Sequence, residues 1–272
     1  MKEWIGILRP VNGVMGILAT WISAFIGVGT DLTHYLVAVS AGSLVVFLVT
    51  SAGNILNDYL DVETDRVNHP GRPLVTGKIS RGSALLVSVI LFLSAPVLSY
   101  LFISILALLI VVVAEGMLVL YETRTKGIGL SGNASISILV GLIFIFGGIC
   151  VSSLDRMILL FGMASLTNFS REIIKDIQDM SGDMDRKTFP MTHGVRMAEL
   201  VSAASVAIAI AISFLPYYYG IFGIFYLMIV IPTDIIFIIS ISYLKVSAGK
   251  SQQVSKIAMI MGLVSFAVGG YF

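Results

Sequence analysis

The chain has 272 residues, of which 57% are hydrophobic and 12% are charged. An ordinary soluble domain carries about 25% charged residues, and the mean hydropathy of +0.97 exceeds what one soluble core could bury. The same composition excludes a disordered chain. The net charge of +1 gives no reason to expect a nucleic-acid partner, and the single cysteine, Cys150, excludes a disulfide framework. The sequence therefore predicts an integral membrane protein.

Apolar stretches of about 20 residues, the length that crosses a bilayer as a helix, follow one another along the chain. The first, residues 10–30, holds no charged side chain and is too long for the hydrophobic region of a cleaved signal peptide. We predict one all-α domain over residues 1–272. Its nine membrane-spanning helices are expected at 10–30, 35–57, 83–100, 101–121, 130–154, 157–174, 198–215, 217–244 and 254–272.

Lysine and arginine fall almost entirely on one side of this topology. With the N-terminus inside, the inner segments are the N-terminus, 58–82, 122–129, 175–197 and 245–255. Every Lys and Arg except Arg156 lies in them or, for Arg171 and Lys256, within one helical turn of them. Because positive residues concentrate on the cytoplasmic side of membrane proteins, we predict a multi-pass protein of the plasma membrane with a cytoplasmic N-terminus.

Two acidic segments on the inner side, residues 54–65 and 171–183, repeat one pattern. Each contains three aspartates spaced i, i+3, i+7, and the second set follows 118 positions after the first. The two sets are Asp58, Asp61 and Asp65, and Asp176, Asp179 and Asp183. This spacing places each set on one helical face, where like charges one turn apart repel each other. The pattern predicts one cation site shared by two halves of the chain.

Hard oxygen ligands at this density suit Mg²⁺, which commonly bridges carboxylates to a substrate phosphate. The predicted ligands are these six aspartates, with two ions as the expected number. Cationic side chains are interleaved with the acids, namely Arg66, Arg72, Arg171 and Lys175. A cation channel would gain nothing from them, whereas a diphosphate held between metal ions and cations would. We therefore predict a magnesium–diphosphate site at the membrane surface.

Other polar residues near the inner helix ends have more than one interpretation. Asn12 and Asn54 fit substrate binding, helix caps or polar contacts between helices. Tyr121 and Lys126 fit catalysis or anchoring at the membrane interface. Glu115, inside the fourth predicted span, is a functional candidate or a hydrogen-bonding partner of a neighbouring helix. No metal is assigned to the isolated histidines His34, His69 and His193.

The acidic segments resemble the two aspartate-rich motifs of the UbiA superfamily of intramembrane prenyltransferases. They read Asn57-Asp58-x-x-Asp61-x-x-x-Asp65 and Asp176-x-x-Asp179-x-x-x-Asp183. Three further stretches are similar to that family: Arg9-Pro10-x-Asn12, Tyr121-x-x-x-x-Lys126 and Arg171-Glu-Ile-Ile-Lys175. Within the family, the compact chain and the stretch from Arg72 to Ser80 most resemble the archaeal digeranylgeranylglyceryl phosphate synthases.

The resemblance implies a ring of nine helices around a cavity that opens sideways to lipid and has its polar cap on the cytoplasmic side. It implies that the nearest Mg²⁺ ligands are Asn57, Asp61, Asp179 and Asp183, and that Asp58, Asp65 and Asp176 support them or contact basic groups. It further implies diphosphate binding by Arg72, Lys126 and Lys175, with Tyr121 near the departing oxygen.

The implied reaction transfers a geranylgeranyl group from geranylgeranyl diphosphate to the free hydroxyl of geranylgeranylglyceryl phosphate. Five inner cations are left over as candidates for the acceptor's phosphate, although topology alone could account for them: Lys78, Arg81, Arg124, Arg186 and Lys187. No obligatory protein partner is inferred.

Three alternatives stay open at this point. A UbiA-type enzyme could use an aromatic quinone precursor or a haem as acceptor. A cation transporter could use acids on two repeated helices, but its acids are expected near the middle of the membrane. A CDP-alcohol phosphatidyltransferase also uses membrane-surface aspartates, but its Asp-Gly-x-x-Ala-Arg motif does not occur around either acidic segment.

Overall fold

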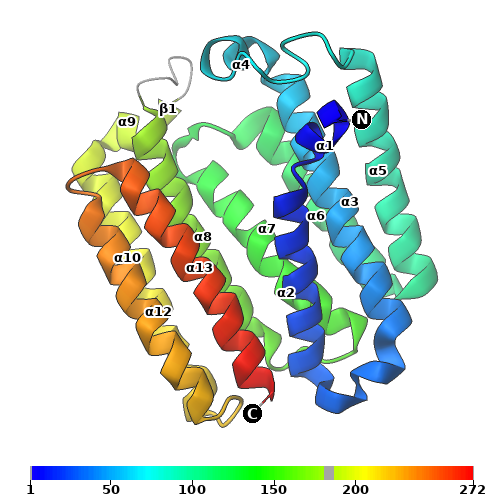
Figure 1. Ribbon diagram of the computed structural model, residues 1–272, viewed down its shortest axis with the longest axis vertical. Helices are drawn as coiled ribbons and strands as arrows, with labels where there is room; N and C mark the ends of the chain where they lie inside the picture. The colour runs from blue at the N-terminus through cyan, green and yellow to red at the C-terminus, as the bar shows by residue number, and fades with distance from the viewer. Residues whose placement is uncertain (1, 181–186, 272) are drawn as a thin grey trace.

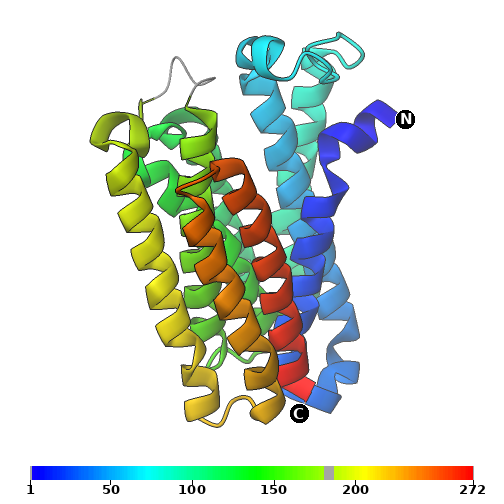
Figure 2. The same ribbon diagram turned by 60° about the vertical axis from the view of Figure 1, so that its left-hand side comes forward.

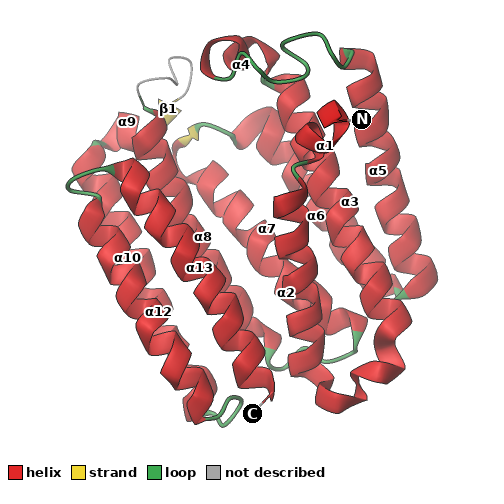
Figure 3. Cartoon of the chain, in the orientation of Figure 1, coloured by secondary structure: helices red, strands yellow, loops and turns green. Residues whose placement is uncertain are grey.

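The computed structural model describes residues 2–180 and 187–271 and shows an almost entirely helical chain (Figures 1 and 3). In chain order its elements are α1 (Lys2–Leu8), α2 (Pro10–Val28), η1 (Gly29–Tyr35), α3 (Leu36–Leu60), α4 (Val62–Asn68), α5 (Arg81–Phe102), α6 (Ile105–Leu120), η2 (Tyr121–Thr125), α7 (Gly129–Cys150), α8 (Met157–Asp179), β1 (Lys187–Thr188), α9 (Phe189–His193), α10 (Val195–Ser213), α11 (Leu215–Tyr218), α12 (Ile224–Tyr243) and α13 (Ala248–Tyr271). The η1 segment is a 3₁₀ helix and η2 is a single π-helical turn.

The long helices stand side by side and form a closed ring. Each packs against the next in the chain, and α13 returns to pack against α2 and α8. The short helices α1, α4 and α9 gather at one end of the ring, which we call the polar end, whereas the C-terminus lies at the opposite end (Figure 1). Figure 2 shows α1 projecting from the top of α2 at this polar end.

Eight helical segments in the described chain are long and apolar enough to cross a membrane. The first covers 51 residues, Pro10–Leu60, and comprises α2, η1 and α3. Because α2 and α3 pack against each other, this segment folds back on itself. The prediction of an all-helical membrane protein is therefore confirmed, whereas nine spans and a cytoplasmic N-terminus stay predictions.

Two predicted boundaries near the C-terminus are wrong. The predicted span 217–244 begins too early, since α11 ends at Tyr218 and a turn precedes α12, which begins at Ile224. The predicted span 254–272 begins too late, since α13 starts at Ala248. Its first two turns contain Lys250, Gln252 and Gln253, so hydropathy excludes residues that the helix includes.

Small residues let the central helices approach closely. A Cβ atom added to Gly141 of α7 would lie 2.1 Å from the Ser165 hydroxyl oxygen and 2.8 Å from the Phe161 carbonyl oxygen on α8. Glycine at such a position permits helix–helix contact at backbone distance. The resulting α7–α8 pair forms one wall of the central cavity and carries the second acidic segment.

Candidate functional site

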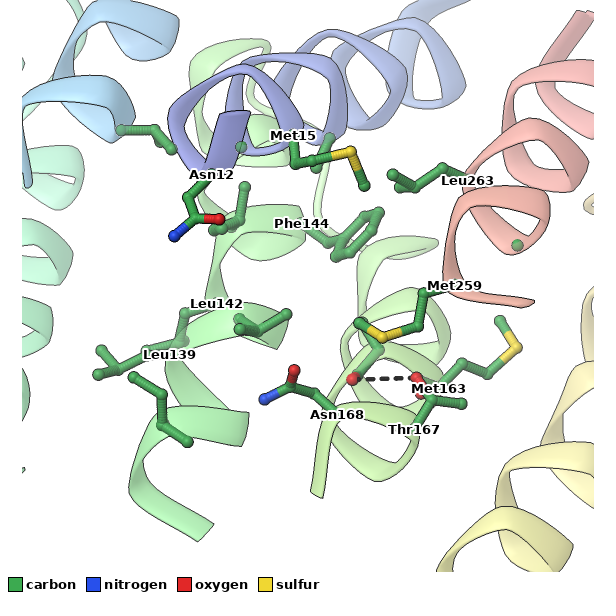
Figure 4. A pocket seen from close by; sticks show the side chains of 18 of the residues that line it. Asn12, Met15, Leu139, Leu142, Phe144, Met163, Thr167, Asn168, Met259 and Leu263 are labelled. Carbon is green, nitrogen blue, oxygen red and sulfur yellow. Dashed lines mark hydrogen bonds between the residues drawn. The ribbon is translucent and has the colours of Figure 1, made fainter. Parts of the chain in front are cut away.

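A cavity of about 620 Å³ lies inside the ring and is lined mainly by apolar side chains. Leu139, Leu142 and Phe144 of α7 line it together with Met15 of α2 and Met259 of α13 (Figure 4). Its polar lining residues include Asn12 on α2, Asn54 on α3, Glu122 on η2, and Asn168 and Arg171 on α8. The cavity therefore combines a long apolar interior with amide and charged groups.

The first acidic segment forms a buried ion cluster. Asp58 and Asp65 are 3% and 4% exposed, and both bind Arg72, whose Nη1 donates to Asp58 Oδ1 at 3.0 Å and to Asp65 Oδ2. Asp58 also pairs with Arg9, which joins α1 to α2 with a φ of 49°, a left-handed conformation that is uncommon outside glycine. The cluster thus ties α1, α3, α4 and the following loop together.

Asp61 differs from its two neighbours in the motif. The helix α3 ends at Leu60, and Asp61 joins it to α4. Its Oδ2 accepts a hydrogen bond from Lys126 Nζ at 2.7 Å. Their spacing predicts that the three aspartates share one helical face. This prediction is wrong, because the helix breaks at Asp61 and its carboxylate meets a different cation.

Lys126 lies at the centre of a second cluster. Its ammonium also donates to Glu122 Oε2 at 2.8 Å, and Asn57 Nδ2 donates to both oxygens of Glu122 at 3.0 and 3.2 Å. The π-helical turn from Tyr121 to Thr125 precedes Lys126 and supplies Glu122 from the same loop. Glu122 also lines the cavity, so this cluster stands where the polar end meets the apolar interior.

The sequence interpretation missed Glu122. Two signals could have found it. A carboxylate four residues before a lysine is a favourable pair on a helix, and Glu122 lies inside the Tyr121–Lys126 motif.

The second acidic segment is held by amide groups on α7 and α8. Asn133 Nδ2 of α7 donates to Asp176 Oδ2 at 2.9 Å. Arg171 pairs with the adjacent Glu172, and its Nε donates to Asn168 Oδ1 at 3.3 Å. Asn133, Asn168 and Glu172 were also missed. Nothing in the local sequence separates the two asparagines from ordinary polar residues, whereas Glu172 lies inside the family-like stretch Arg171-Glu-Ile-Ile-Lys175. Asp179 ends α8.

The remaining predicted residues are dispersed. Asn54 Nδ2 donates to the Leu8 carbonyl at 3.1 Å, whereas Lys175 is exposed. Arg66 is 62% exposed and pairs with Glu63 at the surface, outside both clusters. One carboxylate oxygen of Glu115 is buried without a hydrogen-bond partner in the described chain. Asp183 and Arg186 lie outside the described residues.

The oxygen donors fit Mg²⁺ by their chemistry. Asp61 and Glu122 already converge on one cation, the Lys126 ammonium, and carboxylate and amide oxygens are the ligands that this ion prefers. Within the described ranges, no three His, Cys, Asp or Glu side chains come together as a group that could hold a metal. The predicted ligand set includes Asp183 and stays a prediction.

The chain is similar to known proteins in sequence and in fold. A family model described as the UbiA prenyltransferase family matches residues 16–267. A digeranylgeranylglyceryl phosphate synthase from Methanosphaera stadtmanae is 39% identical over 277 residues, covering 99% of each chain. A solved structure of a digeranylgeranylglyceryl phosphate synthase is 34% identical, with a TM-score of 0.83 over 99% of this chain and 98% of that one. A UbiA homologue from Archaeoglobus fulgidus bound to DMAPP and Mg²⁺ is 18% identical and has the same fold, with a TM-score of 0.69 over 98% and 99% of the chains.

Proposed function

Because the chain belongs to the UbiA prenyltransferase family, we propose that this membrane prenyltransferase moves a geranylgeranyl group from geranylgeranyl diphosphate to the free hydroxyl of geranylgeranylglyceryl phosphate. The product would carry the second ether bond of an archaeal membrane lipid. The observation that carries the proposal is the 39% identity, over nearly the full length of both chains, to a synthase of that name. The location of the polar clusters at the mouth of an apolar cavity supports the same reaction.

The apolar cavity has two tasks in this proposal. Its aliphatic and aromatic walls bind the hydrocarbon tail of the donor, and they exclude water from the allylic cation that develops when the C–O bond breaks. The family chemistry requires no nucleophilic side chain. Consistent with that, the cavity lining carries no cysteine or histidine among the described residues.

The Lys126 cluster supplies positive charge for the leaving group. Two carboxylates fix the ammonium at 2.7 and 2.8 Å, so its position is set before the substrate binds. Preorganised charge of this kind stabilises a transition state without reorganisation during the reaction. We propose that Lys126 binds the departing diphosphate, with Tyr121, at the start of the same turn, nearby.

Asn57, Asp61, Asp179 and Asp183 are the proposed ligands of two Mg²⁺ ions, which would neutralise the diphosphate as Lewis acids. Asp58 and Asp65 have a different proposed task, because Arg9 and Arg72 already bind them. These buried pairs hold the first motif in shape. Asp176, bonded to Asn133, does the same for the second motif.

The polar end is proposed to face the cytoplasm in the plasma membrane. This orientation follows from the concentration of Lys and Arg on one side of the predicted topology. It places the diphosphate site beside the compartment that holds soluble Mg²⁺.

The test is turnover by the purified protein with labelled geranylgeranyl diphosphate. Geranylgeranylglyceryl phosphate, an aromatic quinone precursor and a porphyrin are offered as acceptors in parallel reactions. We expect label to appear in the glyceryl ether. Preference for the aromatic or porphyrin acceptor would contradict the archaeal-lipid assignment but leave the prenyltransferase class intact. Ion flux in liposomes without prenyl transfer would indicate a transporter.

A further inference from the structure

Two cations that do not belong to the Lys126 cluster line the cavity. Of the described Lys and Arg residues, Arg171 on α8 and Lys256 on α13 are the ones that line the cavity. The leftover cations that the sequence offered for the acceptor's phosphate, Lys78, Arg81, Arg124 and Lys187 in the described chain, do not line it. The candidates for a second anion site inside the cavity are therefore on the wall formed by α8 and α13 and not in the surface loops.

The register of the two helices brings these cations to the same level. The helices α8 and α13 pack against each other in opposite directions, and a Cβ on Gly249 would lie 3.8 Å from the Gln178 side chain. Counting seven residues from this contact along each helix reaches Lys256 and Arg171, about 10 Å deeper at 1.5 Å per residue. Met259 of α13 and Thr167 of α8 also line the cavity (Figure 4).

The direction of the Lys256 side chain favours a ligand between this level and the polar end. Long side chains on a helix extend toward its N-terminus, and the N-terminus of α13 lies on the side of the polar end. The Lys256 side chain is therefore expected to extend toward the polar end, where the Lys126 cluster lies. A ligand that contacts both must place one anion near each.

The charges on this wall are unequally compensated. Arg171 pairs with Glu172. In the described part of the chain, no ion pair or hydrogen bond involves the Lys256 ammonium, and the acid on the neighbouring helix, Asp234, accepts a hydrogen bond from the Ser213 hydroxyl at 2.8 Å. Lys256 is exposed and lines the cavity, so its ammonium is accessible to a ligand that enters there. Lys256 is thus the cation on this wall that a ligand anion can satisfy.

We propose that Lys256, assisted by Arg171, binds the phosphate monoester of the acceptor inside the cavity. This inference rests on the proposed function, since it assigns a subsite for that acceptor. The phosphate is attached to the carbon next to the one that bears the free hydroxyl. Holding it on the α8–α13 wall therefore presents the hydroxyl toward the polar end, where the donor diphosphate is proposed to bind.

The experiment compares Lys256→Gln with the matched control Lys250→Gln, which removes the same charge from an exposed position on the same helix that does not line the cavity. Steady-state kinetics are measured with both substrates varied, in an uncharged detergent free of phospholipid. Under these conditions the acceptor is the only source of a phosphate monoester. We expect Lys256→Gln to raise the acceptor KM about tenfold or more, the effect of losing a hydrogen bond to a charged group, with the donor KM unchanged. Lys250→Gln should behave as the unmodified protein.

A second comparison uses the dephosphorylated acceptor, geranylgeranylglycerol. The unmodified protein should bind it as weakly as Lys256→Gln binds the phosphorylated form, and Lys256→Gln should bind both forms equally. Lys256→Arg should restore most of the affinity, and Lys256→Met replaces Gln if that variant does not fold.

Three results would overturn the inference. They are an unchanged acceptor KM in Lys256→Gln, an equal rise in both KM values, and an equal loss in Lys250→Gln. If the unmodified protein does not use the phosphorylated glyceryl ether at all, the proposed function fails and this subsite fails with it. Normal turnover together with an unaffected Lys256→Gln would remove the subsite alone.

Discussion

Arg72 offers a direct test of how the first acidic motif is held together. Its guanidinium binds Asp58 at 3.0 Å and also binds Asp65. The side chains of these aspartates are 4% and 6% exposed. In Arg72→Gln both carboxylates lose this partner. Asp58 keeps Arg9, so the larger penalty is expected at Asp65.

The magnitude follows from the burial of the pair. Removing one partner of a buried ion pair costs about 3–5 kcal/mol. Because Arg72 itself is 24% exposed and Asp58 retains a second cation, we expect a smaller loss of about 2–3 kcal/mol, at or just below the lower limit of that range. At roughly 2 °C per kcal/mol for a chain of this size, the melting temperature should fall by about 5 °C.

The assay is thermal unfolding in detergent, read as the fraction of protein that stays monodisperse after heating. Arg66→Gln is the matched control, because the Arg66–Glu63 pair is 62% and 69% exposed and lies on α4, the helix that carries Asp65. Exposed pairs of this kind contribute about 0–1 kcal/mol. Equal melting temperatures for the two variants would refute the buried-cluster interpretation. Adding Asp65→Asn to Arg72→Gln should recover part of the loss, because it removes the uncompensated charge.

Three further predictions concern activity. Chelation with EDTA should abolish prenyl transfer and added Mg²⁺ should restore it, whereas full activity in chelator would exclude the metal. Asp61→Asn and Asp183→Asn should each lower kcat at least about 10²-fold, because each weakens the charge that supports the leaving group. The control His34→Ala, at an exposed position, should change little. Near-normal turnover by folded aspartate variants would place the site elsewhere. Glu122→Gln should lower kcat/KM about tenfold or more, since it removes a charge-assisted contact to Lys126; Glu63→Gln is its control, and equal rates in the two would separate Glu122 from the site.

The membrane class and the helical order could be predicted because apolar length is a local property of sequence. Every described long helix overlaps a predicted span. The wrong boundaries occur where an apolar stretch is not helical or where a helical stretch is polar. Pro216 and the tyrosines after it continue an apolar run although the chain turns there, and the polar first turns of α13 belong to the helix although they lower the hydropathy.

The partners of the acidic motifs could not be predicted in the same way. The spacing of Asp58, Asp61 and Asp65 is visible in the sequence, but Lys126 is 65 residues from Asp61, and Arg9 is 49 residues from Asp58. These pairs exist because packed helices bring distant segments together. Local periodicity carries no information on which cation a given carboxylate meets, so it assigned all three aspartates one task where the structure shows two clusters.

Lys256 shows how a small boundary error can hide a functional candidate. With a helix predicted to begin at residue 254, Lys256 lies in its first turn and counts as one more positive charge on the inner side. The helix begins at Ala248, which places Lys256 more than two turns inside it, on the same α8–α13 wall of the cavity as Arg171. A lysine at a membrane interface needs no explanation beyond topology, whereas a lysine facing an apolar cavity requires an anion or water as a partner. The helix thus begins six residues earlier than predicted. With this boundary, Lys256 is a candidate for ligand binding in the cavity and not only a marker of topology.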